Sequence, residues 1–150
     1  MSESASPECK ICAADIPAAY EIYSDTLWRV RHSSETNILG YCIVEPRRHF
    51  LDLSEATAAE LAAYGPVLAD IMRIQRDLLK CERIYTFSLA EAVHHFHVHL
   101  IPRSKTFPRA YVGRGIMSYP TSPAADPSLV GHMVTLLKSR LRRSSSYYSD

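Results

Sequence analysis

The sequence predicts an α+β domain with an antiparallel sheet of about five strands, one long helix and a C-terminal helix. Short stretches rich in β-formers follow one another, whereas only one segment among them repeats apolar residues at helical spacing. Strands that are adjacent in sequence favour antiparallel pairing over a βαβ repeat. The 150 residues are 47% apolar and 22% charged, which suffices for one globular core.

Three strands are expected in the first third of the chain. Residues 20–23 and 28–32 alternate and are rich in β-formers, and Ser24-Asp25 between them is typical of a turn. A third short strand covers residues 41–44. It ends before Pro46, which has no N–H to donate to a sheet.

Two helices are expected. Thr57-Ala-Ala-Glu60 has the form of a capping box, and behind it apolar residues recur at helical spacing to about Lys80. Gly65-Pro66 is expected to kink or break this helix near its first turns, because proline lacks an N–H and collides with the preceding turn. Asp126-Pro127 starts a last amphipathic helix, with proline in the first turn, where its missing N–H is tolerated. Its apolar residues are Leu129, Met133, Leu136 and Leu137.

The remaining segments complete one domain with two loose ends. A fourth strand is expected at residues 84–89, and the histidine-rich segment that follows it is expected to be the fifth. Residues 1–8 are polar and are expected to be disordered, and the polar tail, residues 142–150, is expected to be flexible. The domain itself is therefore expected to span residues 9–141.

Charge and hydropathy exclude several classes of function. A net charge of +1 offers no field that steers nucleic acid, whose binding relies on clustered Lys and Arg side chains. The polar, acidic N-terminus has no features of a secretory signal, and no apolar run is long enough to span a bilayer. We therefore expect a cytoplasmic protein that binds no specific nucleic acid and no membrane. In that reducing compartment the four cysteines are not expected to form a disulfide framework.

The segment His95-Phe96-His97-Val98-His99 carries the strongest chemical signal. Side chains two residues apart share one face of a β-strand, so the three imidazoles are expected on one face and the apolar residues between them in the core. Imidazole can attack as a nucleophile, donate to an anion or bind a metal, and it changes charge near neutral pH. The plainer interpretation is a strand with solvated histidines on its open face. Three histidines in strict register argue against it.

The pair Cys9-Lys-Ile-Cys12 is a second constellation. Two residues between the cysteines allow both thiolates to face one metal ion, which makes the pair half of a tetrahedral site. His49, which follows Pro-Arg-Arg, and His95 are the natural candidates for the other two ligands. A redox dithiol is an alternative, but such a motif follows a strand and opens a helix, whereas a strand is expected after this pair. Two cysteines without a special role are the third interpretation.

The order of these motifs resembles that of a known enzyme family. The run from His95 to Ile101 matches the His-φ-His-φ-His-φ-φ signature, where φ is apolar, of the histidine triad (HIT) superfamily of nucleotide hydrolases and transferases. The segment from Gly40 to His49, the long helix and the strand before the triad come in the family's order. The upstream cysteine pair is similar to that of zinc-bearing members and of the related galactose-1-phosphate uridylyltransferases. The resemblance covers roughly two thirds of the chain, from Cys9 to Arg103.

The resemblance implies a mechanism and an assembly. In this family the middle histidine, here His97, attacks the α-phosphorus of a nucleotide derivative, such as a dinucleoside polyphosphate or a nucleoside phosphoramidate. The nucleotidyl-histidine intermediate is then resolved by water or another acceptor. The third histidine, here His99, would hold phosphate oxygens and stabilise developing charge. A HIT-like sheet and a homodimer are implied as well.

The resemblance further implies a structural zinc ion. His95 corresponds to the position that, in zinc-bearing relatives, joins the cysteine pair and the Pro-x-x-His histidine. The expected ligands are therefore Cys9, Cys12, His49 and His95. The ion would brace the strand that presents His97 and take no part in the reaction.

Several positions depart from the family pattern. Tyr41 stands where many members have a histidine, and Ser33 where relatives often carry Asp or Asn for the ribose hydroxyls. Before the triad, Ser88 is expected to approach the substrate, but Glu91 puts a carboxylate near its phosphates. Arg103, with the basic loop that follows, would hold a leaving phosphate in one interpretation and belong to a solvated surface in the other. These departures leave the identity of the substrate open.

Three functions are consistent with these residues. The first is a nucleotide hydrolase or nucleotidyl transferase that acts through His97. The second is a catalytically weak or inactive, zinc-stabilised protein that binds a nucleotide or a partner. The third is a metalloenzyme in which His95, His97 and His99 bind one catalytic metal, which would leave the Cys-x-x-Cys and Pro-x-x-His motifs unexplained. His94 has no counterpart in the triad motif and is interpreted as structural.

Overall fold

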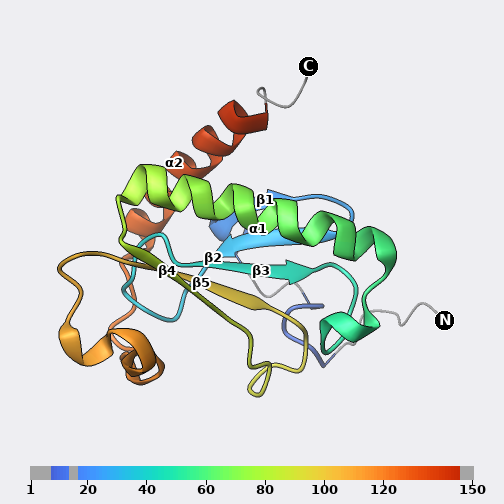
Figure 1. Cartoon of the computed structure of the whole chain (residues 1–150), viewed down its shortest axis with the longest axis horizontal. Helices are drawn as coiled ribbons and strands as arrows, with labels where there is room; N and C mark the ends of the chain where they lie inside the picture. The colour runs from blue at the N-terminus through green and yellow to red at the C-terminus, as the bar shows by residue number, and fades with distance from the viewer. Residues whose placement is uncertain (1–7, 14–16, 146–150) are drawn as a thin grey trace.

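The computed structural model describes residues 8–13 and 17–145 (Figure 1). Residues 1–7 and 146–150, which make up most of the two expected loose ends, lie outside this description. The described part contains short strands, two long helices and short 3-10 helices. In chain order the elements are η1 (Ala18–Tyr20), β1 (Glu21–Ser24), β2 (Trp28–His32), β3 (Cys42–Pro46), η2 (Leu53–Glu55), α1 (Ala58–Leu79), β4 (Arg83–Phe87), β5 (Val98–Arg103), η3 (Arg109–Tyr111), η4 (Gly113–Ser118) and α2 (Pro127–Ser145).

The strands form one five-stranded antiparallel sheet, which confirms the α+β class predicted from the sequence. Their order is β1-β2-β3-β5-β4, so β5 lies between β3 and β4 although it comes last in the chain. Strands β1 and β4 are the two edges. The histidine segment therefore enters the sheet in an interior position, with a hydrogen-bonded neighbour on each side.

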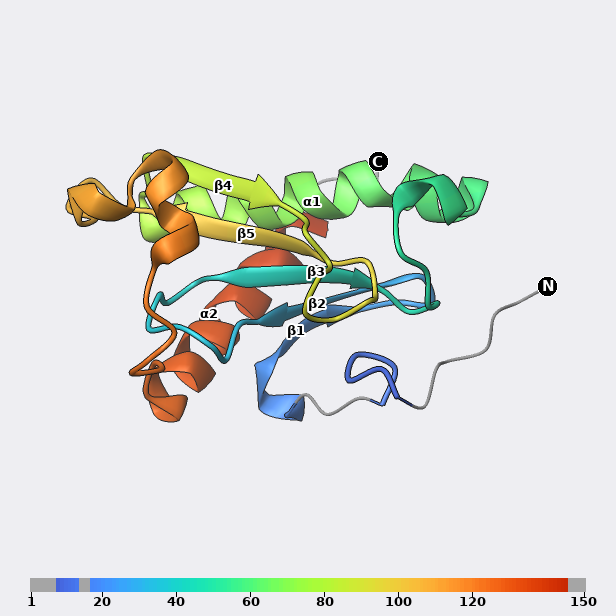
Figure 2. The same ribbon diagram turned by 90° about the horizontal axis from the view of Figure 1, so that it is seen from below.

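Helices α1 and α2 pack on one face of the sheet and lie behind it in Figure 2. Alternate strand residues point toward them and form the main core. Its most deeply buried strand residues include Trp28, Val30, Val44, Val98 and Leu100. Within the described residues, no helix has both the length and the apolar character needed to cross a membrane.

The opposite face of the sheet is covered only in part. A second, smaller apolar cluster includes residues of β3, β5 and η4, and its buried members are Ile38, Tyr41, Ile43, Ile101 and Ile116. The 3-10 segment after β5 thus covers one end of this face. The other end carries the polar side chains of β2, β3 and β5, and it is there that the candidate site lies.

Helix α1 begins with the predicted capping box. Thr57 Oγ1 accepts from the Glu60 N–H at 3.1 Å, and the Glu60 carboxylate accepts from the Thr57 N–H at 3.2 Å. Of the two expected effects of Gly65-Pro66, a kink or a break, the break is wrong, since the helix runs through Pro66 without interruption. Pro66 leaves the Ala62 carbonyl without its helical donor, but both residues are exposed, so water can satisfy that oxygen.

The sequence pattern predicts that the fifth strand begins at His95, the first histidine of the motif. In the structure, β5 begins three residues later, at Val98. The ladder between β3 and β5 ends at the pair Val44↔Val98. Continued by two residues, this register would set Pro46 opposite Phe96, and proline has no N–H for the ladder. The Phe96 N–H instead donates to the Phe50 carbonyl at 2.7 Å. The chain before Val98 is therefore held by single contacts and not by sheet pairing.

Only His99 of the three motif histidines lies within a strand, and His95 and His97 belong to the segment that leads into it. Side chains nevertheless alternate between the two faces of the sheet from Phe96 to Leu100. Phe96 and Leu100 pack in the main core, as predicted, while His99 lies on the opposite face and pairs across the sheet with Ile43 and Phe87.

The turn before β3 depends on Gly40, whose φ of +85° lies in the left-handed region. Its N–H donates to His32 Nε2 at 2.8 Å, and its carbonyl accepts from Gln75 Nε2 at 2.8 Å. A Cβ at this position would collide with the side chain of Leu79. Because His32 and Gln75 are fully buried, Gly40 joins the turn to β2 and to α1 inside the core.

Gly40→Ala is expected to lower the free energy of unfolding by about 2–4 kcal/mol, since it adds backbone strain and overpacking. Urea denaturation followed by circular dichroism measures this change. The control is Gly131→Ala in α2, where a Cβ meets no atom within 4 Å. Ala in a helix interior is expected to raise stability there by roughly 0.5–1 kcal/mol. Equal effects of the two substitutions would contradict the role of Gly40.

Candidate functional site

The backbone carbonyl of His95 orients the imidazole of His97. His97 Nδ1 lies 2.7 Å from that oxygen, and a carbonyl only accepts, so Nδ1 carries the proton. The lone pair is therefore on Nε2, which has no hydrogen-bond partner among the described residues. His97 is 9% exposed, so most of the ring is enclosed. This imidazole is held with a bare nitrogen, the arrangement that a nucleophile requires.

The side chain of His95 points away from His97 and is fully buried. Its Nε2 lies 2.9 Å from the Pro46 carbonyl, which fixes the proton on Nε2 and leaves a lone pair on Nδ1. Nδ1 faces two sulfurs, at 3.6 Å from Cys9 Sγ and 3.5 Å from Cys12 Sγ. A histidine whose outer N–H is bound to a carbonyl is prepared to be a metal ligand.

Cys9, Cys12, His49 and His95 bring one ligand atom each to within 4.8 Å of one another. Cys12 Sγ lies 3.3 Å from His49 Nδ1, and the two Nδ1 atoms lie 3.2 Å apart. A tetrahedral zinc ion separates a sulfur from a nitrogen by roughly 3.5 Å and two nitrogens by roughly 3.4 Å. The donor set and its spacing therefore fit zinc. All four residues predicted as ligands come together.

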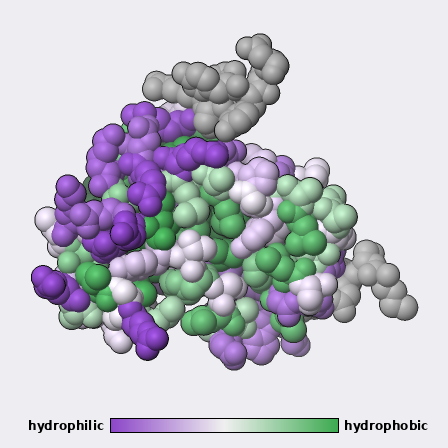
Figure 3. Space-filling view, in the orientation of Figure 1, coloured by the Kyte–Doolittle hydropathy of each residue, from purple (hydrophilic) through white to green (hydrophobic). Residues whose placement is uncertain are grey.

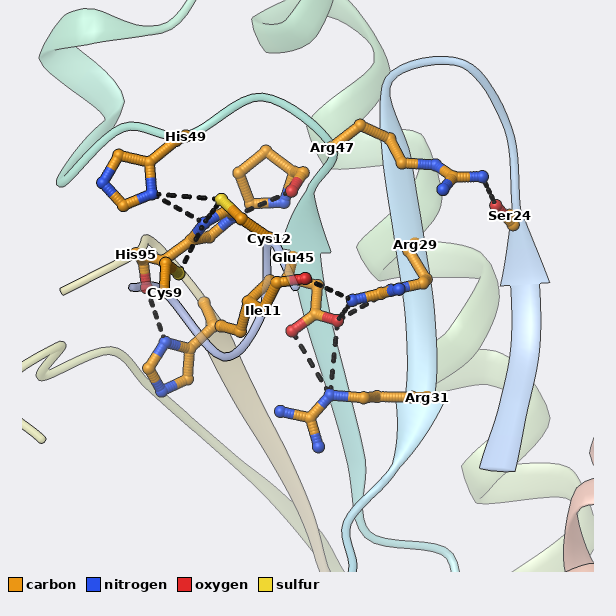
Figure 4. A network of polar contacts seen from close by, with 12 residues as sticks. Cys9, Ile11, Cys12, Ser24, Arg29, Arg31, Glu45, Arg47, His49 and His95 are labelled. Carbon is orange, nitrogen blue, oxygen red and sulfur yellow. Dashed lines mark hydrogen bonds and ion pairs between the residues drawn. The ribbon is translucent and has the colours of Figure 1, made fainter. Parts of the chain in front are cut away.

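A buried carboxylate joins β3 to β2 beside this cluster (Figure 4). Glu45 is fully buried, and its Oε1 lies 2.7 Å from Arg29 Nη2, while Arg31 Nε lies 3.3 Å from each carboxylate oxygen. Arg29 Nη2 also donates to the Ile11 carbonyl at 3.3 Å. Two guanidinium groups thus compensate one buried charge. Through Ile11, the same network holds the loop of the two cysteines against the sheet.

His99 lies next to His97, with ring centroids 4.9 Å apart. Phe87 stacks on its ring at 4.7 Å, and Nδ1 lies 2.6 Å from the hydroxyl of Tyr41. Burial lowers the pKa of His99 to about 4, and the electrostatic influence of the neighbouring His97 and Arg31 acts in the same direction. His99 is therefore neutral at pH 7.

The segment before the triad borders a surface hollow of about 430 Å³. Ser88, Glu91 and His94 line it together with Phe96, and all three polar residues are exposed. Glu91 is thus turned to solvent. The Nε2 atom of His94 lies 3.0 Å from the Glu91 carbonyl, a contact within the segment itself.

Two further residues named from the sequence lie elsewhere. Ser33 is buried beyond the end of β2, where its carbonyl lies 2.7 Å from Nδ1 of His32. Arg103 lies at the far end of β5, roughly 20 Å along the chain from His97 at the rise of a strand. Its guanidinium is paired with Glu82 at 2.7 Å. The structure does not bring either residue to the imidazole of His97.

The charged network and the partners of His99 are absent from the sequence expectations. A signal for the network exists in the sequence, because Glu45 interrupts an otherwise apolar strand and Arg29 and Arg31 alternate with core residues in β2. The sequence marks Tyr41 only as a departure from the family pattern, and no local signal marks Phe87. Both reach His99 only through the strand order, which no local pattern encodes.

Solved structures of similar fold cover almost the whole chain. A zinc-bound histidine triad family protein from Mycobacterium smegmatis has a TM-score of 0.70 at 23% identity, with 93% of this chain and 97% of that one covered. A hypothetical histidine triad nucleotide-binding protein from Sulfolobus tokodaii gives 0.71 at 17% identity, with 95% of each chain covered. The diadenosine triphosphate hydrolase of Plasmodium falciparum gives 0.64 at 14% identity, with 85% and 80% covered.

These likenesses, all below 25% identity, establish the fold. Among the curated proteins, no sequence matches this chain. The family model of the HIT domain matches residues 16–106, which include the sheet, α1 and the triad segment. The chain therefore belongs to the HIT domain family.

Proposed function

We propose that this protein is a nucleotide hydrolase or nucleotidyl transferase that acts at the α-phosphate of a nucleotide derivative. The observation that carries the proposal is the imidazole of His97, whose Nδ1–H is bound to the His95 carbonyl and whose Nε2 is bare. Membership in the HIT family and the likeness to a nucleotide-binding protein and a diadenosine triphosphate hydrolase support it. Dinucleoside polyphosphates and nucleoside phosphoramidates are the proposed substrate classes.

The proposed reaction has two displacements at phosphorus. First, the Nε2 lone pair of His97 forms a bond to the α-phosphorus, the bond from phosphorus to the leaving group breaks, and the leaving group takes the electron pair and a proton from solvent. Second, the oxygen of water or of another acceptor bonds to phosphorus, the phosphorus–nitrogen bond breaks, and the acceptor's proton is released. His97 returns to its starting state with Nδ1–H intact.

The residues around His97 support this chemistry in different ways. His99 is the proposed donor to the phosphate oxygens, because it is neutral and adjacent to His97. Ser88 lines the hollow beside the triad segment and is retained in the proposed binding set. Arg103 is engaged by Glu82 at the other end of β5, so the proposal gives it no part.

We propose zinc as the ion at Cys9, Cys12, His49 and His95, where it supplies structural cross-linking. The donor set, the spacing of its atoms and the zinc-bound relative support this assignment. Because the His95 carbonyl sets the His97 tautomer, a fixed His95 also fixes the nucleophile. Thiolate ligands must stay reduced, which supports a cytoplasmic location.

A homodimer formed through the β4 side is also proposed. Strand β4 is an edge of the sheet, and an edge strand presents unpaired backbone groups that a second copy can use. Leu61 and Leu89 are 46% and 60% exposed. In Figure 3, hydrophobic side chains spread over the middle and right of the face that carries α1, while hydrophilic ones gather over α2. A two-fold partner would cover such apolar surface.

His97→Ala is expected to lower kcat/KM at least about 1,000-fold, because it removes the attacking atom. Wild-type protein is incubated with diadenosine polyphosphates and with adenosine phosphoramidates, and release of AMP is measured by chromatography. Quenched samples are analysed by mass spectrometry of the intact protein, where an acid-labile nucleotidyl adduct is expected on wild type only.

The control is His132→Ala on the exposed side of α2, which should turn over substrate at the wild-type rate. Persistent turnover in His97→Ala would falsify the proposed nucleophile, and absence of turnover in wild type would favour a nucleotide-binding protein.

Cys9→Ala is expected to abolish stoichiometric zinc binding, measured by inductively coupled plasma mass spectrometry, and to lower the thermal midpoint by roughly 10 °C or more. His97→Ala is expected to retain about one zinc ion per chain, because His97 lies outside the cluster. Loss of zinc from both variants alike would support the alternative in which the motif histidines share one catalytic metal.

Multi-angle light scattering is expected to give twice the mass of the chain for the wild-type protein. Leu89→Glu puts a charge on the proposed interface and is expected to shift the protein toward monomer. Leu129→Glu on α2, which is similarly exposed at 53%, serves as the matched control and should leave the mass unchanged. A monomeric wild type would contradict the proposed assembly.

A further inference from the structure

Tyr41 occupies a position beside His99 from which its hydroxyl reaches the ring. It directly precedes β3, it is 6% exposed, and its hydroxyl oxygen lies 2.6 Å from His99 Nδ1. The hydroxyl has no other hydrogen-bond partner among the described residues. The mechanism proposed above uses His99 but leaves open which of its nitrogens carries the proton. The contact with Tyr41 answers that question.

The hydroxyl of Tyr41 donates and His99 Nδ1 accepts. If Nδ1 carried the proton instead, the phenolic proton would be left in a buried place without an acceptor, which is unfavourable. An imidazole nitrogen with a free lone pair is also the better acceptor of the two groups. With Nδ1 accepting, the proton of the neutral ring must lie on Nε2.

Both groups keep these protonation states across the neutral range. Burial raises the pKa of Tyr41 above its ordinary value, with Glu35 adding to the rise and Arg31 opposing it. Burial lowers the pKa of His99 to about 4, with His97 and Arg31 acting in the same direction. Glu35, Arg31 and His97 are the charged or titratable groups that act on the pair. Neither partner therefore changes charge between about pH 5 and pH 9.

Phe87 limits rotation of the His99 ring. Its own ring stacks on the imidazole with an interplanar angle of 17°, in the cross-strand pair Phe87↔His99. A flip that exchanged the two nitrogens would break the bond to Tyr41. The stacking and the hydroxyl together hold Nε2 in one direction, away from Tyr41.

On the basis of the proposed function, we propose that Tyr41 is a positioning residue. It presents His99 to the substrate phosphate as a neutral Nε2–H donor. His97 and His99 are then fixed in opposite tautomers, because the Nδ1 partner of one ring is an acceptor and that of the other ring is a donor. A carbonyl acceptor leaves a lone pair on Nε2 of His97, and a hydroxyl donor leaves a proton on Nε2 of His99. One ring attacks phosphorus while the other donates to its oxygen. Tyr41 thus replaces the histidine common at this position in the family.

The tautomer is tested first, without any substrate. Long-range ¹H–¹⁵N correlation spectra of the zinc-loaded, ¹⁵N-histidine-labelled protein are recorded from pH 5 to pH 8. For His99, the expected pattern is a protonated Nε2 and an accepting Nδ1. Tyr41→Phe removes only the hydroxyl and is expected to shift the Nδ1 resonance and to raise the pKa of His99. A proton on Nδ1 in wild type, or an unchanged spectrum in Tyr41→Phe, overturns the proposal.

Function is tested with the same variant. In Tyr41→Phe, kcat is expected to fall about 10- to 100-fold with KM changed less than about threefold, and the acid limb of the kcat profile is expected to move to higher pH. The control is Tyr119→Phe, whose hydroxyl donates to Asn37 on the surface, and its kinetics should match wild type. An active Tyr41→Phe with an unshifted profile contradicts the positioning role.

Binding separates this inference from the proposed function. AMP serves as the probe. Its addition is expected to shift the His99 Nε2–H resonance in wild type. AMP is also expected to bind more weakly to Tyr41→Phe than to wild type. If wild type binds AMP in this way but turns over no substrate, the proposed function fails and the positioning role stands. If turnover occurs and the Nε2–H resonance does not respond to AMP, the positioning role fails alone.

Discussion

The hydrogen bonds of His95 are the constraint on which the site depends. Its imidazole donates from Nε2 to the Pro46 carbonyl and directs Nδ1 toward the cysteine sulfurs, while its own carbonyl accepts from His97 Nδ1. One residue therefore connects the candidate metal cluster, the end of β3 and the imidazole with the bare nitrogen. Pro46 contributes twice, since its missing N–H ends the ladder and its carbonyl holds the His95 ring.

The face of the sheet away from the helices is divided into an apolar and a polar part. The apolar part lies under the segment after β5, and the polar part combines the imidazoles of His97 and His99 with Arg29, Arg31 and Glu45. Within this network, Arg29 and Arg31 carry one positive charge more than Glu45 compensates. Burial lowers the pKa of His99 and Arg31 acts in the same direction, so the ring stays neutral. Burial and charge thus act together on the same side chain.

Local patterns predicted much of the fold and the candidate metal cluster, because spacing along the chain determines them. The strands, the capping box of α1 and the meeting of the cysteine pair with two histidines all follow from short motifs. The uninterrupted helix at Pro66 was missed because solvent exposure, not sequence, decides whether an orphaned carbonyl is tolerated. The start of β5 was missed because Pro46 acts on it from another strand. The contact between Tyr41 and His99 depends on the pairing of β3 with β5, which are far apart in the sequence.

The double use of His95 has a consequence for how such a protein changes over evolution. The ring serves the ligand cluster, whereas the oxygen that orients His97 belongs to the main chain and is present in every amino acid. A lineage can therefore replace the proposed ligands with apolar residues of similar volume and retain the proposed nucleophile, provided that the backbone path is preserved. In this architecture, metal binding and the orientation of His97 can therefore change independently of each other during evolution.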